Sequence, residues 1–148
     1  MNIDNGTADT FKQAEENQPA KIERILEVPI YNWIILLVGG FDAKELTGIL
    51  KDNGIEKYAI DEIVNNAKMC DPFTVALHYE ISDQHSSVIW LPKPLTLRSI
   101  PAIAHECLHA ANCILGNKGL RLTRESEEAY CYLHTFIFEQ TLNLLNLV

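Results

Sequence analysis

The sequence predicts an α+β protein with one folded domain. Short apolar runs of strand length occur together with longer segments in which apolar residues recur at helical spacing. Hydrophobic residues make up 47% of the 148 residues, which is enough for a sizeable core in a single domain. The first 20 residues differ, because they are polar and contain few large apolar side chains. We therefore expect a disordered or poorly ordered tail over residues 1–20 and a single domain over residues 21–148.

The first half of this domain is expected to contain one buried strand and two short helices. The strand covers residues 28–38 and ends at a pair of glycines. Asp42 is a candidate N-cap for the first helix, and Glu45, three residues later, completes the pattern of a capping box. This helix is predicted to end at about residue 52, and a second helix to cover residues 58–69.

The middle of the chain has the pattern of a β-hairpin. Residues 72–81 and 87–91 are predicted to be strands, and the polar residues 82–86 between them are typical of a turn. Pro92 and Pro94 prevent the second strand from extending far. The sequence therefore predicts a small, mainly antiparallel sheet.

Two longer helices are predicted after the hairpin. One begins near residues 97–101, where a proline is tolerated in the first turn, and ends at Gly116. The other begins at about Thr123, a candidate N-cap, and continues to the C-terminus. We expect the sheet to pack on both of these helices.

Composition and charge exclude two classes of partner. The formal net charge is −8 and no basic cluster is present, which argues against a nucleic-acid-binding surface. The apolar stretch 29–40 is too short to span a bilayer, and the polar N-terminus does not have the pattern of a secretory signal. Four cysteines form no CxxC pair and are interpreted as reduced thiols: Cys70, Cys107, Cys113 and Cys131. We expect them to be buried as small apolar side chains, and the alternative for Cys113 and Cys131 is a place near a metal ion. The sequence thus predicts a cytoplasmic protein without a nucleic-acid or membrane partner.

The run His105-Glu106-Cys107-Leu108-His109 has the pattern HExxH. Residues four apart lie one turn apart on the same face of a helix, so His105 and His109 can offer two imidazole nitrogens to one metal ion. Glu106 lies about 100° further round the helix, within reach of a water molecule on that metal. Two histidine ligands and a neighbouring carboxylate base are the minimal parts of a zinc hydrolase.

The helix that carries this motif is unusual because it has no other charged residue between Ser99 and Asn117. A surface helix normally has Lys and Glu on its outer face, so we expect this one to be buried nearly all round. Buried imidazoles and a buried carboxylate need partners, and a metal ion would provide them. The alternative is a half-exposed helix on which the histidines and the glutamate are solvated.

A catalytic zinc ion needs a third protein ligand, and glutamates follow at a workable distance. Glu128 is nineteen residues after His109, which leaves room for one turn between two helices. Glu127 is the alternative third ligand, on a face of the last helix that it shares with Cys131 and His134. For either glutamate, the other interpretation is a carboxylate at a helix N-terminus, where the helix dipole favours it.

Three further side chains are candidates for the surroundings of the metal. Asn112 lies one turn after His109 on the same helix. Tyr132 and His134 are hydrogen-bond donors that could stabilise a developing oxyanion. For each of the three, a place in the core or on the surface is the alternative.

The residues HECLHAA followed by ESEEAYCYLHTFIF resemble the gluzincin branch of the HExxH zinc metallopeptidases. More narrowly, they resemble small zincin-like proteins of bacteriophages and prophages, over about residues 86–140. The resemblance implies a compact zincin-like fold with one zinc ion per chain. Its ligands would be His105, His109 and Glu128.

The same resemblance implies hydrolysis of peptide bonds in a peptide or protein substrate, with Glu106 as the general base. Gluzincins often have an aspartate four residues after the ligand glutamate, and this chain has Tyr132 at that position. A tyrosine there could donate a hydrogen bond to a ligand. The alternative function is that of a binding or regulatory protein of phage or prophage origin, which has the zincin fold and no catalytic turnover.

Overall fold

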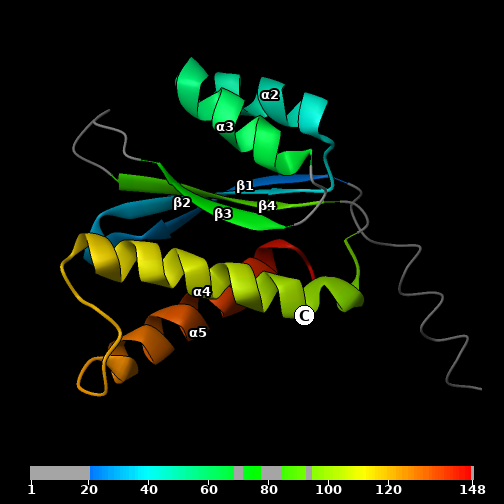
Figure 1. Ribbon diagram of the computed structural model, residues 1–148. Helices are drawn as coiled ribbons and strands as arrows, with labels where there is room; N and C mark the ends of the chain where they lie inside the picture. Colours follow the sequence, from blue (N-terminus) through cyan, green and yellow to red (C-terminus); the bar gives the residue numbers. More distant parts are fainter. Residues whose placement is uncertain (1–20, 69–71, 78–84, 93–94, 148) are drawn as a thin grey trace, which may run out of the picture.

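The computed structural model describes residues 21–68, 72–77, 85–92 and 95–147. These residues form a mixed sheet with helices on both faces (Figure 1). Helices α2 (Ala43–Asp52) and α3 (Lys57–Ala67) cover one face, and α4 (Ile100–Asn117) and α5 (Glu127–Leu144) lie on the other. The predicted α+β class is therefore confirmed. The predicted N-terminal tail lies outside the described residues.

The sheet contains β1 (Ile22–Val28), β2 (Trp33–Gly39), β3 (Phe73–Leu77) and β4 (His85–Leu91), in the spatial order β1-β2-β4-β3. The antiparallel pairing of the predicted hairpin is confirmed by β3 and β4. β4 begins at His85, inside the predicted turn, and residues 82–84 of that turn lie outside the described residues. β1 and β2 also pair antiparallel, whereas β2 and β4 in the centre are parallel. The parallel pairing was not predicted, because it joins strands that are separated in the chain by α2, α3 and β3.

The prediction of a single strand over residues 28–38 is wrong. The chain reverses direction at a short 3-10 helix, Pro29–Tyr31, and at Asn32, which has a left-handed φ of 50°. Asparagine adopts this conformation more readily than most residues, so it can close the reversal. The strands on either side then pair from Val28 opposite Trp33 onwards. The sequence pattern concealed the turn, since the apolar run continues across it.

The first helix after β2 begins with the capping box that the sequence predicts. A side-chain oxygen of Asp42 accepts hydrogen bonds from the backbone N–H groups of Lys44 and Glu45, at 2.9 and 2.8 Å. The Glu45 carboxylate in turn accepts from the backbone N–H of Asp42. The inner sides of α2 and α3 form a small core with β2 and β4, which consists of Leu36, Val38, Leu46, Ile49, Leu50, Ala59, Ile60, Ile63, Ala67, Val88 and Trp90.

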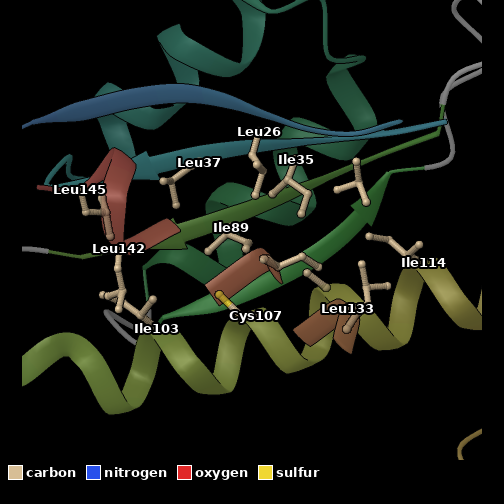
Figure 2. Close-up of a cluster of buried hydrophobic side chains, with 14 of the residues drawn as sticks. Leu26, Ile35, Leu37, Ile89, Ile103, Cys107, Ile114, Leu133, Leu142 and Leu145 are labelled. Atoms are coloured by element: carbon tan, nitrogen blue, oxygen red, sulfur yellow. The ribbon is translucent and has the colours of Figure 1, made fainter. Parts of the chain in front are cut away.

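The larger core lies between the sheet and the helices α4 and α5. Figure 2 shows Ile103, Cys107 and Ile114 from α4 with Leu133 and Leu142 from α5 beneath the strands. The sheet therefore packs on both helices, as predicted. α4 ends one residue after Gly116, close to its predicted end.

The start of α5 differs from the prediction. Its N-cap is Ser126 and not Thr123. The backbone N–H of Ser126 donates to the carbonyl oxygen of Thr123 at 3.2 Å, which closes a separate turn before the helix begins. The loop is held further by the hydroxyl of Tyr130, which donates to the carbonyl oxygen of Leu120 at 2.9 Å.

Ile137 is fully buried at the centre of the inner side of α5, so its truncation should lower the stability of the protein. Ile137→Ala removes three methyl or methylene groups from a packed site and leaves a cavity. We expect the free energy of unfolding to fall by about 2–5 kcal/mol. Urea denaturation followed by circular dichroism measures the change. The matched control, Thr135→Ala, removes an exposed side chain of the same helix and should change stability by less than about 0.5 kcal/mol.

Candidate metal site

The two histidines of the HExxH motif lie on the outer face of α4, and both are exposed. The Nε2 atom of His105 is 3.0 Å from the Nε2 atom of His109, and the rings meet edge to face at an interplanar angle of 81°. In a tetrahedral zinc site with Zn–N distances of about 2.0–2.1 Å, two ligand nitrogens are about 3.3 Å apart. Small side-chain rotations therefore suffice to bring both nitrogens onto one zinc ion.

Glu106, between the two histidines in sequence, lies in a different environment. Its side chain is buried, with an exposed fraction of 4%. Its charge is close enough to act on the neighbouring Cys107, whose pKa it helps to raise. The side chains of the motif thus differ in solvent access: the two histidines face water, and the carboxylate is sheltered.

The expectation that α4 is buried nearly all round is wrong on one side. The helix buries Ile103, Glu106, Cys107, Ala110, Ala111, Ile114 and Leu115. The opposite side, with His105, His109 and Asn112, is exposed, and Leu108 there has an exposed fraction of 45%. The sequence was misleading because this outer side has neutral residues where a surface helix normally has Lys and Glu.

The third ligand that the sequence predicts is not assembled in this structure. Glu127 and Glu128 begin α5, and both are exposed. Within residues 21–68, 72–77, 85–92 and 95–147, no three His, Cys, Asp or Glu side chains are grouped to hold a metal ion. The reason lies in how α5 is rotated: Tyr130, Leu133 and Ile137 face the core, so Glu128 is on the opposite side of the helix.

His134 connects α5 to α4 immediately before the motif. Its Nε2 atom is 3.0 Å from the carbonyl oxygen of Ala104, and its ring stacks on Phe138 at 6.0 Å between centroids. A carbonyl oxygen only accepts, so Nε2 is the donor in this hydrogen bond. Nε2 is thus engaged with Ala104 and does not serve as the oxyanion donor that the sequence predicts for His134. Nothing in the sequence signals the contact, since residues 104 and 134 are adjacent only through the packing of the two helices.

The other two candidates differ in their relation to the histidine pair. Asn112 is exposed on the outer face of α4, one turn after His109, as the sequence predicts. Tyr132 is on the outer side of α5 with an exposed fraction of 74%. It shares that side with Glu128, directed away from the core.

The described cysteines are all free thiols, but their environments differ. Cys107 is buried, and this burial raises its pKa to about 12, while a hydrogen bond with the hydroxyl of Thr141 acts in the opposite direction. Cys113 is half-buried, and burial also raises its pKa. Cys131 is exposed, so its interpretation as a buried thiol is wrong. In the part of the chain that the structure describes, no helix combines the length and apolar character needed to cross a bilayer.

Comparisons of the chain with protein-family models, with curated proteins and with solved structures find no match. The features of the chain that bear on metal binding are two exposed histidines with ring nitrogens 3.0 Å apart and a buried carboxylate that lies between them in sequence.

The cysteine environments predict how the thiols react. At pH 8, Cys107 remains protonated because its pKa is about 12, and it is shielded from reagents. We expect Cys107→Ser to leave the number of rapidly reacting thiols unchanged, whereas Cys131→Ser lowers it by one. Titration of the native protein with a coloured disulfide reagent counts these thiols, and unfolding in guanidinium provides the total. Rapid loss of one thiol in the Cys107→Ser variant would contradict the assignment.

Proposed function

We propose that this chain is a zinc-dependent metallopeptidase of the gluzincin type. The observation that supports it most directly is the 3.0 Å separation of the Nε2 atoms of His105 and His109. At this distance the two nitrogens share a hydrogen bond, and the spacing is within a few tenths of an ångström of the separation of about 3.3 Å that one tetrahedral zinc ion requires. The buried Glu106 lies next in sequence to the first ligand, where a base for a metal-bound water is needed.

The proposed reaction is hydrolysis of a peptide bond. Bound zinc would supply a water molecule with a pKa near 7 and polarise the scissile carbonyl. Glu106 accepts the proton of that water and later transfers it to the leaving amine. The burial of the Glu106 carboxylate supports its role as a general base, because bulk water then competes less for its proton-accepting oxygens. The two histidines hold the ion on a helix whose inner side is fixed in the core.

A third protein ligand belongs to this proposal. The sequence favours Glu128, with Glu127 as the alternative. The rotation of α5 favours Glu127, which shares a flank of the helix with His134, the residue that contacts α4. In either case the exposed start of α5 has to approach the histidine pair when the metal binds.

A second function is favoured by one observation. Because no third ligand is grouped with His105 and His109 among the described residues, the chain also fits a zincin-like binding or regulatory protein without turnover. Such a protein would bind zinc and lack cleavage, so the two functions differ in one measurable property.

The proposed role of Glu106 predicts that Glu106→Gln retains zinc but lowers peptide cleavage by about 10²–10⁴-fold, the usual contribution of a general base. The assay incubates the zinc-loaded protein with a peptide library and identifies cleaved products by mass spectrometry. Glu139→Gln, an exposed glutamate of α5, is the matched control and should leave cleavage unchanged. Equal cleavage by pure Glu106→Gln protein would exclude the mechanism, and zinc binding without cleavage by the unaltered chain would favour the binding protein.

The assignment of the ligands predicts that His105→Ala and His109→Ala each weaken zinc binding by more than about 100-fold, since even partners outside the ligand set contribute 10–100-fold. Both side chains are exposed, so the fold should persist by circular dichroism. Calorimetric titration of metal-free protein with zinc chloride measures the affinity. Asn117→Ala, at the exposed end of the same helix, is the control. Unchanged affinity in both histidine variants would place the metal elsewhere.

A further inference from the structure

The outer face of α4 is exposed and carries no fixed charge, a property that the proposed catalysis does not require. It exposes His105 and His109 directly to solvent, and its neighbours Leu108 and Asn112 are also exposed. Apart from Glu106, which is buried, no residue of the helix carries a fixed charge. The protein has a formal net charge of −8, so two copies repel each other on average. The exposed side of α4 adds no fixed charge to that repulsion.

The histidine pair also occupies only half of a zinc coordination shell. Zinc in proteins is almost always four-coordinate and tetrahedral when its site is closed. The pair supplies two of these four positions, and the described residues bring no further ligand to it. A second copy related by a twofold axis would supply the same two nitrogens, because a twofold interface presents the same surface patch from both partners. Four imidazoles would then complete the tetrahedron.

Taking these two observations together, we infer that zinc joins two copies of this chain through α4, with His105 and His109 of each copy on one ion. This inference rests on the zinc binding of the proposed function and not on its catalytic turnover. Leu108, with an exposed fraction of 45%, lies beside the pair and provides apolar contact between the copies.

The zinc-bridged pair would regulate the same site. A zinc ion that holds four imidazoles has no open position for water or for a scissile carbonyl. The zinc-bridged pair is therefore catalytically inactive, and the single chain is the form that can hydrolyse a peptide. Cleavage per chain should rise when the zinc-loaded protein is diluted, since dilution separates the two copies.

The experiment titrates metal-free protein with zinc chloride and measures molar mass by light scattering after gel filtration. We expect the mass to double from the 16.7 kDa of one chain when one zinc ion is present for every two chains, and to return on addition of a chelator. His105→Ala combined with His109→Ala should remain a single chain at every zinc concentration. Leu108→Lys places two cations near each other at the contact, so it should weaken the pairing by about tenfold or more while zinc still binds to a single chain.

The outcomes separate this inference from the proposed function. One zinc ion bound per chain, with the mass of a single chain, would overturn the pairing and leave the peptidase proposal intact. Pairing at one zinc per two chains supports the inference whatever the Glu106→Gln assay shows about cleavage. An absence of zinc binding would overturn both. Pairing that persists in the double histidine variant would also overturn the inference, because the contact would then not depend on the metal.

Discussion

The packing of α4 against the sheet and against α5 is the constraint on which the candidate site depends. Ile103, Cys107 and Ile114 are fully buried and fix the rotation of the helix about its axis. A helix turns by about 100° per residue, so a rotation of α4 by one position in either direction would turn one of the two histidines toward the core. The geometry of the motif is thus set by apolar contacts on the side of the helix opposite to the two histidines.

This rotation explains the unequal environments within the motif. His105 and His109 face water, and Glu106 is held at the edge of the core. The hydrogen bond from His134 to the carbonyl oxygen of Ala104 adds a polar link between α5 and the turn that precedes the motif. Two exposed histidines and one sheltered carboxylate suit both the proposed hydrolysis and a zinc-bridged pair of chains. The two states differ in what completes the coordination of the ion.

Local patterns predicted the elements that depend on local interactions. The capping box of α2 is made by Asp42 and Glu45, three residues apart, so the sequence alone reveals it. The β3–β4 hairpin and the end of α4 near Gly116 were predicted for the same reason. The turn at Asn32 was missed, because an apolar run continues across it, and so was β1. The parallel pairing of β2 with β4 joins distant segments, and no local pattern encodes such a pairing.

By itself, the sequence determined that His105 and His109 lie on one face of a helix and that Glu106 lies beside them, because helical periodicity requires it. It did not determine which side of that helix meets the solvent, since the usual signal, charged residues on the outer face, is missing. Only the tertiary structure decided this, through the apolar residues of α4 that the sheet and α5 bury. The tertiary structure also turned Glu128 away from the pair, because the inner side of α5 is occupied by larger apolar side chains.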